Sequence, residues 1–247
     1  MKGRLKKESL SNDPEKEQNG FKTTFRSLRY RNFRLFFAGQ SISLIGTWIQ
    51  RIAMPWLVYD LTKSVVLLGV VGFIGQVPTF LLSPFAGVLT DRWNRYHILI
   101  TTQILAMVQA AVLAWLVFNQ AVEVRHIVLL SWFLGCVNAF DIPARQSFVI
   151  KMVEKKEDLG NAIALNSSIV NGARLLGPSL AGILIAATGE GICFLINAVS
   201  YIFVIASLLL MKVGPNEIMG QGKPVLKEFK EGLSCFHFQG PLFYPWF

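Results

Sequence analysis

Charged residues are scarce in this sequence, and long blocks contain none. Asp, Glu, Lys and Arg make up only 16% of the 247 residues, whereas soluble domains carry about a quarter. Residues 65–89, 96–118 and 191–211 have no charged side chain at all. Because an apolar helix of about 20 residues spans the hydrocarbon core of a bilayer, these blocks exclude an ordinary soluble domain and predict an integral membrane protein.

Other residue types that support chemistry are also few or scattered. Two of the three cysteines, Cys136 and Cys193, lie inside apolar runs and the third, Cys235, in a polar segment, so no disulfide is expected. The three histidines are far apart, which argues against a metal site. The sequence has no phosphate-binding glycine loop and no nucleophile with a matching base. We therefore expect no cofactor, no metal, no nucleotide hydrolysis and no enzyme activity.

The sequence does contain a regular series of apolar segments. They predict an all-α membrane protein with six spans, at about residues 34–59, 65–90, 96–118, 126–150, 159–188 and 191–211. The six-helix domain would occupy residues 34–212, after a disordered polar tail over residues 1–20. Residues 21–33 mix aromatic and basic side chains. This pattern suits a helix on an anionic membrane surface, or equally a basic flank that only fixes topology.

The basic residues are distributed unevenly between the two sides of the predicted membrane. The net charge of +9 could suggest nucleic-acid binding, but 19 of the 24 Lys and Arg residues fall on the side that holds both termini. Only two, Lys63 and Arg125, fall in the opposite loops, and the other three lie within spans. Cytoplasmic loops carry the excess of Lys and Arg. The distribution therefore predicts cytoplasmic termini and no nucleic-acid partner.

A short polar turn between the second and third spans carries a recognisable pattern. Asp91 and Arg95 are four positions apart and would face each other on a helical turn, although a solvated loop would look similar. The pattern G-x-L-x-D-R-x-x-R is formed by Gly87, Leu89, Asp91, Arg92 and Arg95. It resembles the loop motif between the second and third helices of the major facilitator superfamily, with Asn94 where that family usually has Gly. The resemblance implies a conformational switch at these residues.

The fifth span has small residues at a helical spacing around a proline. Such residues let two helices approach closely, and proline bends a helix. The pattern A-x-x-x-G-P-x-x-A-G is formed by Ala173, Gly177, Pro178, Ala181 and Gly182. It resembles the antiporter motif of proton-coupled drug exporters in the same superfamily, although general helix packing would also explain it.

A broader resemblance covers residues 25–212. The stretches NFRLFFAGQSISLIGTWIQ, WLVYDLT and DIPARQSF are similar to the branch that includes the enterobactin exporter and macrolide efflux proteins. The resemblance implies two inverted three-helix repeats, forming the N-terminal half of a twelve-helix fold in the bacterial inner membrane. It also implies a secondary transporter that exports drugs or siderophore-like small molecules in exchange for protons.

Several polar side chains lie inside the predicted spans, where they are costly and usually face a cavity or a partner. On the first span they form one stripe, and Asn171 lies on a polar face of the fifth. We predict that the substrate cavity includes Gln40, Thr47, Gln50, Arg51 and Asn171. The alternative is that the stripe only packs against other helices.

The spans contain one deep acid, Asp141. Arg145 is four residues later on the same helical face, and Arg174 lies in the fifth span. By resemblance, Arg95 of the loop can pair with an acid on the fourth helix in a charge relay that reports the transport state. We predict a relay of Asp141 with Arg95 or Arg145, with Arg174 as a further candidate; a purely structural ion pair is the alternative.

Residues 213–247 begin like the cytoplasmic linker between transporter halves and end in an unusual aromatic stretch. Either a premature stop or a half-size protein that pairs with a second six-helix half or a second copy would explain this ending. The other partners expected are the bilayer, a small-molecule substrate and protons. The alternative functions are a transport-inactive fragment or scaffold, and the membrane domain of an ATP-driven exporter. Short loops disfavour the exporter domain.

Overall fold

A computed structural model describes residues 26–153 and 155–212, without the side chain of Asp91. The elements in these ranges are η1 (Arg26–Arg29), α2 (Arg31–Thr62), α3 (Val65–Arg92), α4 (Arg95–Phe118), α5 (Val124–Lys151), α6 (Lys156–Thr188) and α7 (Glu190–Leu209). These ranges contain no strand, as the all-α prediction requires. The predicted tail at 1–20 and the linker and ending at 213–247 lie outside the described residues.

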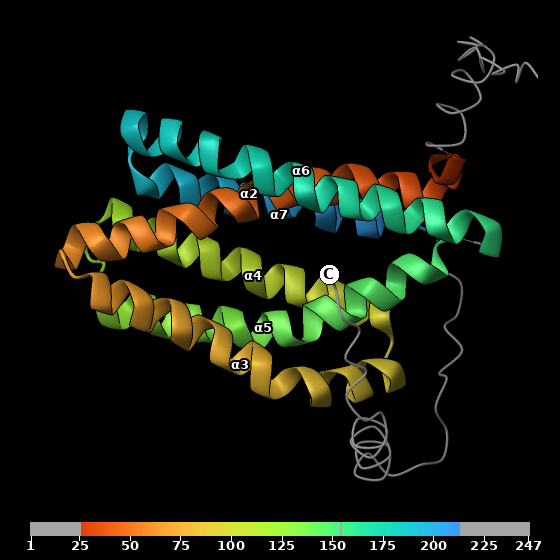
Figure 1. The fold of residues 1–247 in the computed structure, drawn as a ribbon, viewed down its shortest axis with the longest axis horizontal. Helices are drawn as coiled ribbons and strands as arrows, with labels where there is room; N and C mark the ends of the chain where they lie inside the picture. The colour runs from red at the N-terminus through yellow and green to blue at the C-terminus, as the bar shows by residue number, and fades with distance from the viewer. Residues whose placement is uncertain (1–25, 154, 213–247) are drawn as a thin grey trace, which may run out of the picture.

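The six long helices lie lengthwise in one bundle, and consecutive helices are antiparallel and joined by connections of only a few residues (Figure 1). The two ends of the described chain lie together. The Asn32 side chain donates to the carbonyl oxygen of Lys212 (2.8 Å) and accepts from its backbone N–H (3.2 Å). Both ends of the domain therefore lie on the same side of the bundle.

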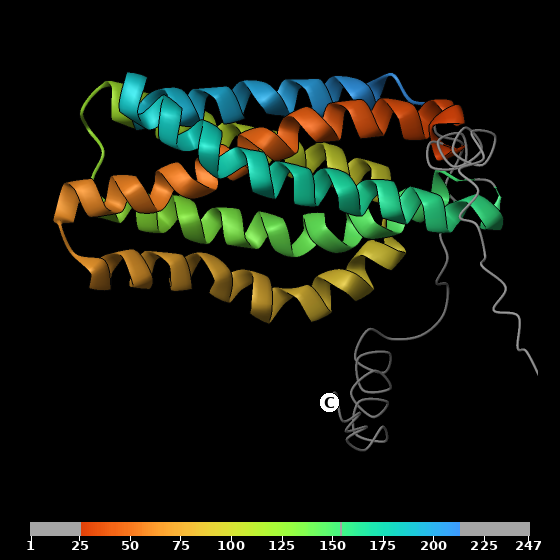
Figure 2. The ribbon, with the colours of Figure 1, turned by 45° about the horizontal axis from the view of Figure 1, so that its top comes forward.

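Five of these helices, α3 to α7, are long and apolar enough to cross a membrane by length and composition. The first predicted span, α2, does not meet this criterion, because its 32 residues include the polar stripe and several charges. It nevertheless packs lengthwise against α7 and α6 within the same bundle (Figure 2).

Neighbouring helices share two apolar clusters, one toward each end of the bundle. The cluster nearer the chain ends includes Phe36, Phe148 and Leu208, and the other includes Ile49 and Phe194. The most extensive helix pairs are α2 with α7, α3 with α5, α4 with α7, α2 with α6, and α4 with α5. In this arrangement α4 and α7 are the most buried spans, whereas α3 and α6 are the least buried.

Glycines allow the closest of these helix contacts. A Cβ on Gly46 of α2 would overlap Ser200 of α7, and one on Gly135 of α5 would overlap the carbonyl oxygen of Gly75 of α3. The α3–α5 contact is close enough for Thr79 to donate a hydrogen bond to the carbonyl oxygen of Gly135 (2.8 Å). Small residues therefore set the spacing of the bundle, as is common between membrane helices.

The described part of the basic segment at 21–33 is docked onto the start of α6. Asp158 is fully buried there, with Arg26 Nε at 2.5 Å, Arg29 at 3.4 Å and the Tyr30 hydroxyl donating at 2.8 Å. The Ser27 hydroxyl also donates to the Asp158 carbonyl oxygen (2.9 Å). We refer to Arg26, Ser27, Arg29, Tyr30 and Asp158 as the N-terminal clasp. Contact of this segment with the lipid surface stays a prediction.

Candidate functional site

The deep acid Asp141 lies on α5 and is only 2% exposed. Its Oδ2 forms an ion pair with Arg145, one helical turn further along α5. Its Oδ1 accepts hydrogen bonds from two residues of α4, the Thr102 hydroxyl (2.9 Å) and the Gln103 amide (2.7 Å). The carboxylate is thus held by one charge and two neutral donors, which offset the cost of placing it in an apolar environment.

Of the predicted partners for Asp141, the structure brings only Arg145 next to it. Arg95 is the first residue of α4, seven residues or about 10 Å along the helix from Thr102, and it is not a partner of Asp141. Arg174 lies against Trp48 of α2 instead. The pair with Arg145 has the spacing of four that places both side chains on one helical face, and a charge relay through Asp141 stays a prediction.

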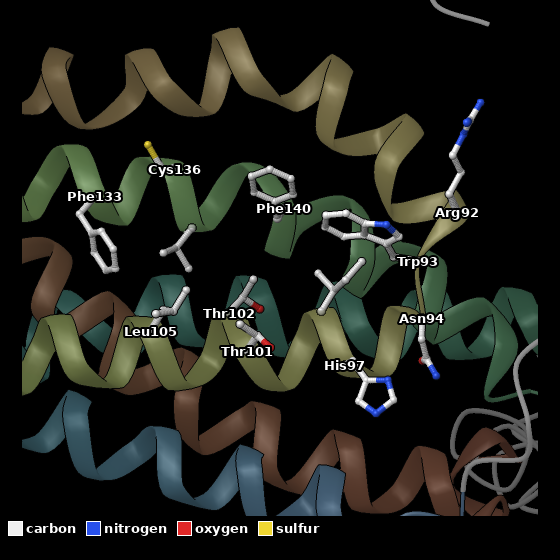
Figure 3. A pocket seen from close by; sticks show the side chains of 12 residues that line it. Arg92, Trp93, Asn94, His97, Thr101, Thr102, Leu105, Phe133, Cys136 and Phe140 are labelled. Carbon is white, nitrogen blue, oxygen red and sulfur yellow. The ribbon is translucent and has the colours of Figure 1, made fainter. Parts of the chain in front are cut away.

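A cavity of about 610 Å³ lies beside this site, between α4, α5 and the turn after α3 (Figure 3). Apolar side chains form most of its wall. Trp93 and Phe140 lie near the end closest to the turn, and Phe133 lies toward the other end. Thr102 also lines the cavity, and its hydroxyl is bonded to Asp141. The volume is within the range of small-molecule pockets, and Thr102 connects it to the buried carboxylate.

This cavity contains none of the residues predicted to line a substrate path. On α2, Gln40 and Gln50 are only 3% and 4% exposed. Gln50 donates to Gln109 of α4 (3.0 Å) and accepts from Asn197 of α7 (2.8 Å). In this conformation the inner edge of the stripe packs between helices, and a place for Gln40 and Gln50 on a substrate cavity stays a prediction.

Gln109 and Asn197 also belong to this polar contact, and neither was predicted from the sequence. Each is an uncharged polar residue inside an apolar span, and each is at most 1% exposed. The sequence feature that could have indicated them is the one that indicated Gln50, an amide side chain inside an apolar span. A buried amide in a span needs a hydrogen-bond partner on another helix.

The outer edge of the stripe does reach an open surface. Arg51 on α2 is exposed, Thr47 is half-buried, and Asn171 on α6 is exposed. The Thr47 hydroxyl and the Asn171 amide donate to the carbonyl oxygens of Ser43 and Ser167, each on its own helix. These three residues remain candidates for a substrate-facing surface.

The loop motif is divided between two helices. α3 continues through Arg92, and Arg95 begins α4 after the two-residue turn Trp93–Asn94. Asn94 caps α4 by accepting a hydrogen bond from the backbone N–H of Tyr96 (3.0 Å). Arg92 lines the cavity, whereas Gly87 faces open space with no atom within 4 Å of an added Cβ. Gly87 therefore makes no close helix contact with the other described residues, and its role in a conformational switch stays a prediction.

The motif of the fifth span packs along only one edge. Ala173 is buried, and a Cβ on Gly177 would overlap the Cβ of Trp48 on α2. Pro178 lies inside a continuous α6. Gly182 has no atom within 4 Å of an added Cβ, so the packing role predicted for it is absent here. The reason is geometric, since Gly177 and Gly182 are five residues apart and lie on different helical faces.

The comparison with protein families identifies the fold. A family described as "Transmembrane secretion effector" matches residues 22–234, which is most of the chain. The chain belongs to this branch of the major facilitator superfamily. Membership agrees with the resemblance seen in the loop motif and places the chain in a family of multi-pass membrane transporters.

The chain is also similar to curated transporters and efflux proteins. The chain is 28% identical to the staphyloferrin A transporter of Staphylococcus aureus, over 68% of this chain and 42% of the relative. It is 22% identical to macrolide efflux protein A of Streptococcus pyogenes, over 87% and 54% respectively. It is 22% identical to the multidrug efflux pump Tap of Mycobacterium tuberculosis, over 81% and 48%. The chain therefore spans about half the length of these major facilitator relatives.

Proposed function

We propose that the chain is a secondary active transporter domain of the bacterial inner membrane that exports small molecules in exchange for protons. The substrates would be drugs or siderophore-like molecules, as the names of the relatives indicate for those proteins. Both termini would be cytoplasmic, because the Lys and Arg excess lies on their side.

The observation that carries this proposal is the buried pair of Asp141 and Arg145. An ionisable pair inside a span is expensive and marks an ion or substrate pathway more often than a structural contact. Protonation of Asp141 would release Arg145 and weaken the bonds from Thr102 and Gln103 on α4. Since those bonds join α4 to α5, a proton at Asp141 would change the contact between two helices, which is what coupling requires.

The pattern of helix contacts supports two inverted repeats. In this comparison α2 corresponds to α5, α3 to α6 and α4 to α7. The α3–α5 pair then corresponds to the α6–α2 pair, and the α2–α7 pair corresponds to the α5–α4 pair. All four are extensive, and the α4–α7 pair converts into itself. Because each repeat would have three spans, the second would necessarily be inverted relative to the first. This assignment makes α2 the first of six spans.

A flux measurement tests the proposed function. The protein would be expressed from its native gene and reconstituted into vesicles. The vesicles would be loaded with a fluorescent drug and supplied either with a proton gradient or with ATP alone. We expect flux that requires the gradient and stops with a protonophore. Flux that requires ATP would instead support the exporter-domain alternative.

The length of the relatives supports a second candidate, in which this chain works only together with another half. The cavity of such transporters lies between two repeats or halves, and the chain corresponds to about half of each relative. If the purified chain alone gives no flux, but flux appears when a second six-helix half is co-expressed, this second candidate holds. If neither the chain alone nor the co-expressed pair gives flux, the remaining alternative is a scaffold or a transport-inactive fragment.

A further inference from the structure

Two arginines of different helices meet at one tryptophan on the open surface of the bundle. Trp48 of α2 has the guanidinium carbon of Arg51 at 4.9 Å from its ring centroid and that of Arg174 of α6 at 5.8 Å. Both distances fall within the range of cation–π contacts. The two guanidinium carbons are therefore within roughly 11 Å of each other. We refer to Trp48, Arg51 and Arg174 as the arginine–tryptophan cluster.

The cluster lies far from the ends of its two helices and carries unbalanced positive charge. Arg51 is 11 residues from the nearer end of α2 and Arg174 is 14 residues from the nearer end of α6, which places them roughly 16 and 21 Å from those ends. Both side chains are exposed. Among the described residues, no carboxylate forms an ion pair with either of them. Such charges inside a membrane domain need water or an anion to stabilise them.

The exposed sides of the helices show which of these environments the cluster faces. On α7, all exposed residues are apolar: Leu195, Val199, Ile202, Phe203, Ala206 and Leu209. That side suits lipid. The exposed side of α6 carries Ser167, Ser168, Asn171 and Arg174, and beside Arg174 it also exposes Leu175 and Leu176. Arg174 therefore lies at the end of a polar strip, bordered by leucines, that the exposed side of α7 lacks.

The helix packing holds the cluster together. Gly177 lies one turn after Arg174 and contacts the Cβ and backbone of Trp48. This close approach brings α6 near enough for Arg174 to reach the indole ring of α2. The indole fixes both guanidinium groups before any ligand arrives, so binding would cost less side-chain entropy.

We propose that the arginine–tryptophan cluster is a binding site for carboxylate groups of the transported molecule, which makes the substrate class anionic. The proposal rests on the proposed transport function and names its substrate class. Guanidinium groups bind carboxylates through two parallel hydrogen bonds, and two of them at one indole can bind a molecule with more than one carboxylate. The indole and its apolar neighbours would contact the rest of the molecule.

Binding to the purified 247-residue chain in nanodiscs tests this proposal. The probes are radiolabelled citrate, salicylate as an aromatic monocarboxylate, and tetraphenylphosphonium as a cation. We expect citrate to bind more tightly than salicylate, and the cation not to compete. Arg51→Gln and Arg174→Gln should each weaken citrate binding at least tenfold. The control Arg125→Gln changes an exposed loop arginine, paired with Glu123, and should leave binding unchanged.

A second pair of variants covers the case in which a glutamine variant fails to fold. Arg51→Lys and Arg174→Lys retain the charge but lose the planar fork, and should weaken citrate binding to an intermediate degree. The proposal is overturned if neither carboxylate binds, or if binding is the same in every folded variant. If the unaltered chain binds no citrate but shows gradient-driven flux of a neutral drug, the anion site is overturned and the proposed transport function stands. If citrate binds in an arginine-dependent way but no flux is seen, the anion site stands and the proposed transport function is overturned.

Discussion

At the scale of single residues, Asp141 offers the sharpest test of coupling. Asparagine would keep the shape and could still accept from Thr102 and Gln103, but Arg145 would lose its counter-charge. We expect Asp141→Asn to reduce gradient-driven flux at least tenfold with normal membrane insertion, because the site could no longer gain and lose a proton. The measurement is flux in vesicles normalised to the amount of inserted protein. The control is Glu123→Gln, at the exposed start of α5.

A double variant separates coupling from simple charge pairing. If Asp141 only neutralises Arg145, then Asp141→Asn with Arg145→Gln removes both charges and should restore flux. If Asp141 carries the proton, the double variant should regain thermal stability while flux stays low. Restored flux would therefore contradict the coupling role.

Asp158 in the N-terminal clasp is predicted to matter for stability. Asp158→Asn removes the charge that Arg26 and Arg29 contact. The arginine side chains are 40% and 50% exposed, so solvent screens much of the loss, and the cost should be about 1–3 kcal/mol. Thermal unfolding in detergent measures it. Asp60→Asn, which breaks the exposed pair with Lys63, should lower stability by less than about 1 kcal/mol; equal effects of the two variants would show that the clasp adds nothing.

The sequence identified some of these residues and not others for physical reasons. The pair of Asp141 and Arg145 could be predicted, because a deep charge is rare and a spacing of four gives one helical face. Asp158 could not, since an acid in the first turn of a helix usually only complements the helix dipole. Its burial depends on η1, which begins 132 residues earlier in the chain.

At the scale of the helices, Gly177 and Gly182 form a matched pair for testing the α2–α6 contact. Gly177→Ala would overlap Trp48, whereas Gly182→Ala would meet open space. We expect Gly177→Ala to lower stability by about 1–3 kcal/mol through overpacking. Gly182→Ala should be neutral or stabilising by up to about 1 kcal/mol through helix propensity. Thermal unfolding of both variants in the same detergent checks this, and equal values would mean that the close contact does not form.

Hydropathy predicted the helices well but not their full length or their faces. α2 begins at Arg31 and α6 at Lys156, three residues before the apolar segments predicted at 34 and 159, because a helix continues past the hydrocarbon core where charged ends reach water. The polar stripe of α2 was visible in the sequence. Which edge of it is buried depends on α4 and α7, and no local pattern carries that information.

At the scale of the whole molecule, α3 and α6 each have a face that no other described residue covers. An added Cβ on Gly69 or Gly72 of α3, or on Gly160 or Gly172 of α6, would meet no atom within 4 Å. Small residues on an exposed face allow another helix to approach closely. The two helices also correspond under the proposed repeat exchange, so the faces form a matched pair. We predict that a second six-helix half or a second copy docks there.

Cross-linking in membranes tests this docking. In a chain with Cys136, Cys193 and Cys235 replaced by alanine, cysteines placed at Gly72 or Gly172 should react with a short bismaleimide and give a band of higher mass. A cysteine at Val199, on the exposed apolar side of α7, should give none, because that side suits lipid. A band at twice 27.6 kDa identifies a second copy, and any other mass identifies a separate half. If α3 and α6 cysteines behave like Val199→Cys, these faces contact lipid alone and the half-molecule interpretation of the fold fails, since nothing would then complete the cavity wall beside Arg51 and Arg174.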